Sequence, residues 1–218
     1  MIAAAPAPGI SRPSGPARVA GAVLAERAGR VTASPVNLDS PLGTVTGVGY
    51  QASAEDGGTG LSIVFPEKAD GTYAVLRGQA SVAFSVRGAA PSGVEVSKGK
   101  VAYREIFPGV DSVHQLNGNR SEEFLVLADE RAATEFTYDL DIAPGVEFAR
   151  LPSGGLRLTA GNEDSDTLDI EAPYVIDATG RTSYTAARYE IDRDVPGQAT
   201  IRLAVDTTGL VFLSLIHI

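Results

Sequence analysis

The sequence predicts an all-β protein, with one or two antiparallel β-sandwich-like modules behind a low-complexity N-terminal segment. Three observations support this fold class. From about residue 43 onward, apolar and polar residues alternate in short runs, which places one set of side chains on each face of a strand. Groups of Asn, Asp, Gly and Pro separate these runs and are typical of tight turns. No apolar stripe with helical period and useful length follows residue 30.

The N-terminal segment differs in composition from the rest of the chain. Residues 1–40 are rich in Ala, Pro, Gly, Ser and Arg, and their prolines interrupt any regular element. We therefore expect a linker or disordered segment there. The alternative for residues 20–29, AGAVLAERAG, is a short helix.

The expected strands fall into two regions, 41–98 and 99–212, with a possible boundary near residues 88–99, where RGAAPSG interrupts the pattern. The run FLVLA at 124–128 is apolar throughout and predicts a strand covered on both faces. Elsewhere the alternation predicts strands with one wet face, and it is clearest at 61–65, 82–86, 136–142, 156–158, 168–170, 189–191 and 201–205.

Composition excludes several classes of protein. The 218 residues are 44% hydrophobic and 21% charged, which suits a globular chain with a real core. A net charge of −9 disfavours nucleic-acid binding. The absence of cysteine excludes disulfides, thiolate metal sites and cysteine nucleophiles. No apolar stretch approaches the roughly 18 residues of a membrane span, and the first residues lack the features of a signal peptide.

The last six residues, LSLIHI (213–218), read like the translation of a transposon-derived sequencing adapter, CTG TCT CTT ATA CAC ATC. We expect this tail to be non-native, so that His217 carries no functional information and the parent protein continues beyond it. The alternative is a genuine apolar tail that continues the strand ending near Val211. Native codons for LSLIHI at the locus would refute the adapter hypothesis.

Four sequence pieces occur in a fixed order: YREIFPGVD (103–111), SEEFLVL (121–127), FTYDLDI (136–142) and PYVIDATG (173–180). In order and spacing they resemble a β-rich module of large exported bacterial proteins, the RHS/YD-repeat and DNRLRE-domain proteins. The resemblance implies a structural, surface-associated role and brings no catalytic residues with it. One departure is that the lysine that usually precedes the Glu of the second piece is replaced, which gives the sequence Ser121-Glu122-Glu123.

The residues of these pieces have a structural interpretation. Pro108 and Gly109 predict a turn, and Asp111 is expected to bond nearby backbone amides and fix the next strand. Asp177 in IDATG is expected to do the same. The full set of predicted motif residues is Pro108, Gly109, Asp111, Glu123, Pro173, Asp177 and Gly180.

Catalytic chemistry is not expected. His114 lies in the alternating segment VDSVHQL without a nucleophile elbow, which favours an ordinary strand histidine. The adjacent Glu122 and Glu123 point to opposite faces of a strand, so they do not form an acid/base pair. A pocket that gathered acids and His114 would argue against this interpretation.

A cofactor is not expected either, with calcium as the alternative. In the acidic stretch 161–171, Asn162, Asp164 and Asp166 alternate like part of a calcium loop. The glycine and terminal glutamate of such a loop are not correctly placed, which favours a solvated acidic turn.

Together these features predict a non-catalytic structural or interaction module of a large secreted or cell-surface bacterial protein. Its expected partners are neighbouring domains of the parent chain, and possible further ones are the cell envelope or glycans. One alternative is a carbohydrate- or calcium-binding accessory domain of a secreted hydrolase, and another is a hydrolase that uses carboxylates. The aromatic side chains available for sugar binding are Tyr50, Tyr73, Tyr103, Tyr174 and Tyr184.

Overall fold

The computed structural model describes residues 49–53, 61–97, 100–117, 120–161, 166–192, 196–212 and 214–217. Within these ranges the chain is almost entirely β and contains no helix, so the predicted all-β class is confirmed. No helix in this part of the chain is therefore long and apolar enough to cross a bilayer. The predicted linker, residues 1–40, lies outside the described residues.

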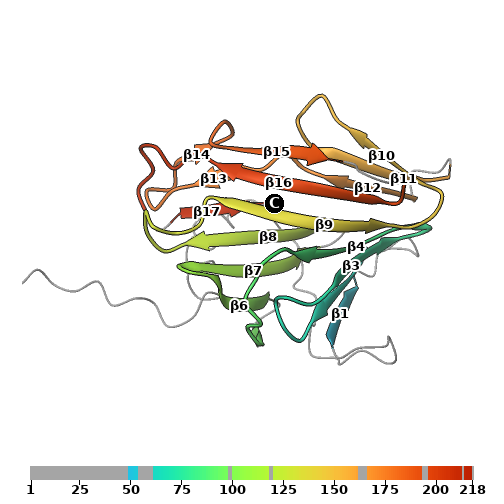
Figure 1. The fold of residues 1–218 in the computed structure, drawn as a ribbon, viewed down its shortest axis with the longest axis horizontal. Coiled ribbons are helices and arrows are strands. Elements are labelled where there is room, and N and C mark those ends of the chain that lie inside the picture. The colour runs from blue at the N-terminus through green and yellow to red at the C-terminus, as the bar shows by residue number, and fades with distance from the viewer. Residues whose placement is uncertain are drawn as a thin grey trace, which may run out of the picture.

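Three antiparallel sheets build the described part of the fold (Figure 1). The first sheet has the order β1 (Gly49–Ser53), β2 (Ser62–Pro66), β3 (Tyr73–Arg77), β4 (Ala80–Val86), β9 (Glu135–Ile142), β16 (Gln198–Val205), β15 (Ala187–Asp192). The second sheet has the order β14 (Thr182–Ser183), β13 (Tyr174–Ile176), β17 (Ser214–His217), β8 (Arg120–Leu127), β7 (Val110–Asn117), β6 (Lys100–Phe107), β5 (Val94–Ser97). The small sheet consists of β10 (Val146–Arg150), β11 (Leu156–Ala160) and β12 (Thr167–Ile170).

The alternation seen in the sequence sets which side chains enter the core. In β9, Phe136, Tyr138, Leu140 and Ile142 are buried, while the residues between them are at least partly exposed. In β8, every residue from Phe124 to Leu127 is buried, as the apolar run predicts. Side chains at alternate positions therefore fill the space between the sheets.

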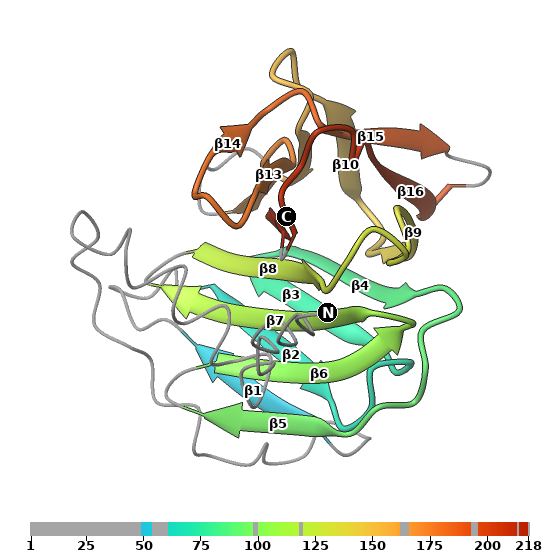
Figure 2. The same cartoon turned by 90° about the vertical axis from the view of Figure 1, so that its left-hand side faces the viewer.

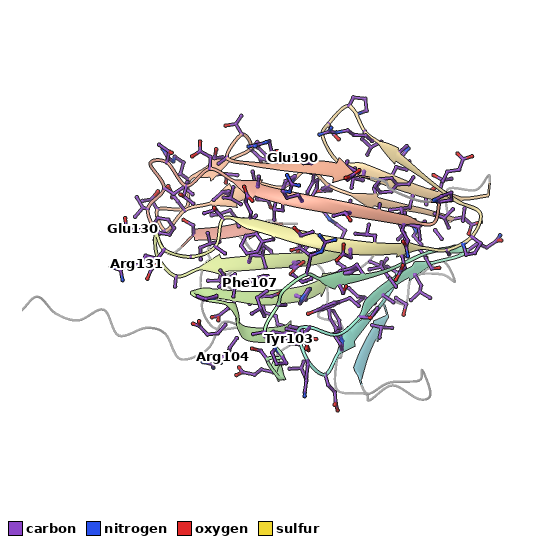
Figure 3. All side chains as sticks on the ribbon, viewed as in Figure 1. Tyr103, Arg104, Phe107, Glu130, Arg131 and Glu190 are labelled. Atoms are coloured by element: carbon purple, nitrogen blue, oxygen red, sulfur yellow. The ribbon has the colours of Figure 1, made fainter. Side chains whose placement is uncertain are left out.

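The two large sheets face each other as the layers of a sandwich, with β5 to β8 in front of β1 to β4 in Figure 2. One hydrophobic core cluster includes residues from Leu61 to Ile216. Strands on both sides of the 88–99 segment share the first sheet, because β4 pairs with β9. Exposed charged side chains lie outside the core, such as Arg104 next to buried Tyr103, and Glu130 and Arg131 after β8 (Figure 3).

The β6–β7 hairpin contains the FPGVD motif. Phe107 pairs with Val110, so Pro108 and Gly109 form a two-residue turn, and Gly109 has the positive φ of 71° that glycine tolerates. The strand bulges between Tyr103 and Phe107, where Glu105 takes a φ of 47°. Two hydrogen bonds hold this bulge: Glu105 N donates to Asp111 Oδ1 (2.8 Å), and Gly109 N donates to Glu105 Oε2 (3.0 Å). Asp111 therefore holds the bulge that precedes the turn.

Asp177 organises the turn between β13 and β14. Its Oδ1 accepts hydrogen bonds from Thr179 N (2.9 Å), Thr179 Oγ1 (2.5 Å) and Arg181 N (3.1 Å). These hydrogen bonds hold the pKa of the Asp177 carboxyl below its usual value, although desolvation opposes them. Gly180 follows with a φ of 81°.

The segment 214–217 forms β17, which lies between β8 and β13 in the second sheet. Its Ile216 is fully buried in the core cluster, and Ser214 is buried as well. A short apolar strand in this position pairs its backbone N–H and C=O groups with those of both β8 and β13. The hypothesis that this segment derives from an adapter concerns the gene and stays a prediction.

Replacing Asp177 by Ala is expected to lower the free energy of unfolding by about 1–3 kcal/mol, because Thr179 N and Arg181 N lose their acceptor. Urea denaturation measures the change. Asp206→Ala is the matched control, since the exposed Asp206 accepts one backbone bond, from Thr208 N, and its loss should cost less. Equal losses for the two variants would contradict the assignment.

Replacing Ile216 by Ala is expected to lower the free energy of unfolding by about 2–4 kcal/mol, because the change leaves a cavity in the core. Val211→Ala, at a side chain 49% exposed, is expected to change it by less than about 0.5 kcal/mol. Thermal and urea unfolding provide the comparison. If Ile216→Ala is as mild as Val211→Ala, β17 is not part of the folded sheet.

Candidate functional site

One pocket of about 410 Å³ opens between the three sheets. Its interior is mainly aliphatic and aromatic, and a polar group at its inner wall consists of His114, Glu123, Tyr138 and Tyr189. We call this cavity the inter-sheet pocket. Its apolar lining comes from Leu61, Ile63, Val75, Val82, Phe84, Leu140, Leu158, Leu168, Ile170 and Ile201.

The polar group has its origin in the register of β7 and β8. His114 lies directly opposite Glu123, and Ser112 lies two residues before His114 on the same face of β7. Ser112 Oγ donates to Glu123 Oε1 (2.9 Å) and lies 2.9 Å from His114 Nε2. The Tyr138 hydroxyl, from the facing sheet, donates to Glu123 Oε2 (3.3 Å). We call Ser112, His114, Glu123 and Tyr138 the buried polar cluster.

Aromatic rings surround the histidine of this cluster. The His114 ring lies 5.3 Å from Phe65, 5.3 Å from Tyr73 and 5.9 Å from Tyr103, measured between centroids. Its side chain is 2% exposed. Water therefore has little access to the imidazole.

Burial shifts the acid and the base of the cluster in opposite directions. It raises the pKa of the Glu123 carboxyl to about 7, against the lowering effect of the hydrogen bonds from Ser112 and Tyr138. It lowers the pKa of His114 to about 3. Although His114 Nε2 lies 3.8 Å from Glu123 Oε1, the imidazole is neutral at pH 7, so the contact is not an ion pair there.

Two residues that line the pocket each hold a buried polar atom without a hydrogen-bond partner among the described residues: the Tyr189 hydroxyl and Arg77 Nε. Tyr189 is 3% exposed, and burial, followed by the nearby Glu123 carboxyl, raises the pKa of its phenol. Arg77 uses its Nη1 to donate to Thr167 O (3.2 Å), which fixes the guanidinium against β12. Buried polar groups without a protein partner are uncommon and call for an explanation.

The rim of the pocket carries charges that are mostly paired. Arg120 Nη2 lies 2.7 Å from Glu171 Oε2. The carboxylate of Asp169 accepts two hydrogen bonds from Arg157, each of 2.6 Å, which hold the pKa of Asp169 below its usual value. Glu122, half-buried, completes the acidic part of the rim.

The structure brings together residues that the sequence analysis treated separately. Glu123, predicted only as a motif residue, lies at the centre of the cluster, and His114 is its cross-strand neighbour. The pocket does gather His114 and several acids, the arrangement named above as contrary to a non-catalytic role. The sequence reasoning missed Ser112, Tyr138, Tyr189 and Arg77. A charged Glu directly before FLVL was the signal available for a buried acid.

The calcium candidates and Pro173 lie away from the buried polar cluster or outside the described residues. Of the calcium candidates, Asn162 and Asp164 lie outside the described residues, while Asp166 is buried and accepts from Gln79 N (2.8 Å) and Gln79 Nε2 (3.2 Å). Asp166 therefore joins β12 to the β3–β4 turn. Pro173 is buried just before β13.

The tyrosines considered for sugar binding do not form a flat exposed platform. Tyr73 and Tyr103 are buried in the core. Tyr184 is 73% exposed, but its ring is tilted by 45° to that of Tyr174. The side chain of Tyr50 lies outside the described part of the chain.

Comparison with known proteins gives no relative from which a role is transferable. No family model, no curated protein and no solved structure matches the chain.

Replacing Glu123 by Gln is expected to remove a pH dependence of stability. The folded pKa of about 7 lies above the ordinary 4.5, so the native state holds the proton more tightly than the unfolded chain. The contribution is complete below pH 4.5 and is lost as the pH rises through 7, a total of roughly 3 kcal/mol. The stability of wild type relative to Glu123→Gln should fall by that amount between pH 4.5 and 8, measured by urea denaturation.

Glu122→Gln is the matched control, since it removes a carboxylate from the half-buried neighbouring position. If the stability difference between wild type and Glu123→Gln stays constant with pH, the pKa of the Glu123 carboxyl is the same in the folded and the unfolded protein, which would contradict the prediction.

Proposed function

We propose that the chain is a non-catalytic structural or interaction module of a large secreted or cell-surface bacterial protein. The observation that supports a non-catalytic role is the hydrogen-bond network within the buried polar cluster. Ser112 and His114 are 1% and 2% exposed, and the serine hydroxyl and the Glu123 carboxylate bond to each other. Such a network stabilises a fold when its members are satisfied.

The hydrogen-bond pattern of the cluster differs from that of a serine hydrolase. In a catalytic triad the acid bonds to the imidazole nitrogen that faces away from the serine and orients the base. Here His114 Nε2 and Glu123 Oε1 both meet the same Ser112 oxygen. If His114 Nε2 carries the proton, it donates to Ser112, and Ser112 donates to Glu123, which satisfies the chain without an activated nucleophile.

A hydrolase based on two carboxylates is also disfavoured. That mechanism needs two acids inside one site, one of them with a raised pKa. Glu123 meets the pKa requirement, but the rim acids Asp169 and Glu171 pair with arginines, and Asp169 has a lowered pKa. Among the described residues, Glu123 is the buried acid of the pocket, and the remaining lining acid, Glu122, is half-buried at the rim.

The resemblance to RHS/YD-repeat and DNRLRE-domain proteins supports the second half of the proposal. The motif residues that carry it make local contacts suited to a stiff scaffold: the bulge held by Asp111 and the turn held by Asp177. Sequencing of the complete gene tests this half. YD repeats or DNRLRE domains downstream and a signal peptide upstream would support it, whereas an intracellular operon context would contradict it.

A fluorophosphonate probe tests whether Ser112 is a nucleophile. We expect no labelling of Ser112 in the folded protein, because its hydroxyl is buried and engaged. Ser112→Ala should instead lower the free energy of unfolding by about 1–3 kcal/mol, since Glu123 loses a donor. Ser183→Ala, at a half-buried position in β14, serves as the control. Labelling of wild type that Ser112→Ala abolishes would overturn the non-catalytic assignment.

A further inference from the structure

The inter-sheet pocket leaves apolar side chains partly uncovered on the inner face of the first sheet. Val75 lies two residues after the buried Tyr73 in β3, and Phe84 of β4 lies directly opposite Tyr73, so all three face the interior of the sandwich. Val75 and Phe84 are nevertheless only half-buried, and both line the pocket. Because inward-facing apolar side chains normally pack closely against one another, the core has room at this place for a further apolar group.

The pocket extends across several strands of that sheet. Four successive strands, β3, β4, β9 and β16, each contribute apolar lining, namely Val75, Val82, Leu140 and Ile201. Neighbouring strands lie about 4.8 Å apart, so these four extend over roughly 14 Å. The small sheet adds Leu158 to the lining. A volume of about 410 Å³ spread over this length is narrow, which suits an elongated molecule.

The charged groups at the rim already have partners of opposite charge. Arg120 pairs with Glu171, and Asp169 accepts two hydrogen bonds from Arg157. Arg157, and after it Arg77, hold the pKa of the Asp169 carboxyl below its usual value, so Asp169 offsets the charge of Arg77 as well. The rim therefore does not call for a charged ligand.

The polar groups at the inner wall also favour an uncharged occupant. Burial lowers the pKa of His114 to about 3, so its imidazole is neutral at pH 7. The Glu123 carboxyl accepts hydrogen bonds from Ser112 and Tyr138, and burial raises its pKa to about 7, which opposes its ionisation. Glu122, at the rim, has an interaction partner as well. A charged group that entered the pocket would lose its hydration without gaining a counter-ion among the described residues, which is unfavourable.

From these observations we propose that the inter-sheet pocket binds an uncharged, elongated apolar molecule of the long-chain alcohol type. The alkyl chain lies against the inner face of the first sheet, where it covers Val75 and Phe84, and runs across the strands from β3 to β16. At the roughly 30 Å³ that one water molecule occupies in the liquid, the pocket has room for about fourteen non-hydrogen atoms. This site goes beyond a structural role, since the module would hold a small molecule in addition to its neighbouring domains.

Calorimetric titration of the full chain with 1-alkanols from hexanol to dodecanol tests the proposal. The affinity should rise about fourfold for each added methylene. Dicarboxylates and diammonium ions of the same length, with one charge at each end, should bind at least about a hundredfold more weakly, because one charged end must enter the apolar pocket. Affinity independent of chain length, equal affinity for either doubly charged series, or no binding of any alkanol would overturn the proposal.

A variant that fills the pocket locates the site. Val75→Phe adds about four non-hydrogen atoms at a half-buried lining position, so the rise of affinity with chain length should stop about four carbons earlier than in wild type. Val211→Phe makes the same change at a side chain that is 49% exposed and outside the pocket lining, and it should keep the wild-type dependence on chain length.

Ile170→Phe repeats the test from the small sheet, in case Val75→Phe does not fold. Ile170 is half-buried in β12 and also lines the pocket, and the change adds about three non-hydrogen atoms. The limiting chain length should therefore shorten by about three carbons. Thermal unfolding without ligand checks that each variant folds. If the folded variants bind every alkanol as wild type does, the chain binds elsewhere on the protein and the proposal is wrong.

Discussion

The Glu123 carboxyl group is buried between two apolar sheets, and the arrangement around it follows from the cost of placing it there. An ionised carboxylate is unfavourable in such surroundings unless it is hydrogen-bonded or neutralised. The protein does both: Ser112 and Tyr138 donate to its two oxygens, and burial raises its pKa to about 7. Burial lowers the pKa of the neighbouring His114 imidazole, which therefore stays neutral and adds no second buried charge.

This cluster also connects the layers of the sandwich. Ser112, His114 and Glu123 belong to the second sheet and Tyr138 to the first, so the hydrogen bond between Tyr138 and Glu123 crosses the core. A polar contact across an apolar core favours one relative placement of two sheets, since a shift of either would leave a buried group unpaired. The pocket lies beside this contact, and its position therefore depends on the same register of β7 and β8.

The fold class was predictable from the sequence because alternation acts locally, as β9 shows residue by residue. The turn held by Asp177 was predictable for the same reason, since its partners lie within four residues. The buried polar cluster was not, because it depends on which strands pair. Ser112 and His114 are two residues apart, but Glu123 is nine residues from His114, and Tyr138 comes from another sheet. Tyr189 and Arg77 line the same cavity, although three strands of the first sheet separate β15 from β3, and local patterns do not specify that strand order.

The Ser112–His114–Glu123–Tyr138 cluster is a buried and hydrogen-bonded part of the core. Titration of the Glu123 carboxyl and the His114 imidazole by NMR, with Glu123→Gln used to assign the carboxyl signal, tests this most directly. The account predicts a Glu123 midpoint near pH 7 and an imidazole that remains neutral down to pH 5. A Glu123 midpoint near 4.5 together with a His114 midpoint near 6.5 would mean that water reaches both groups, and would contradict it.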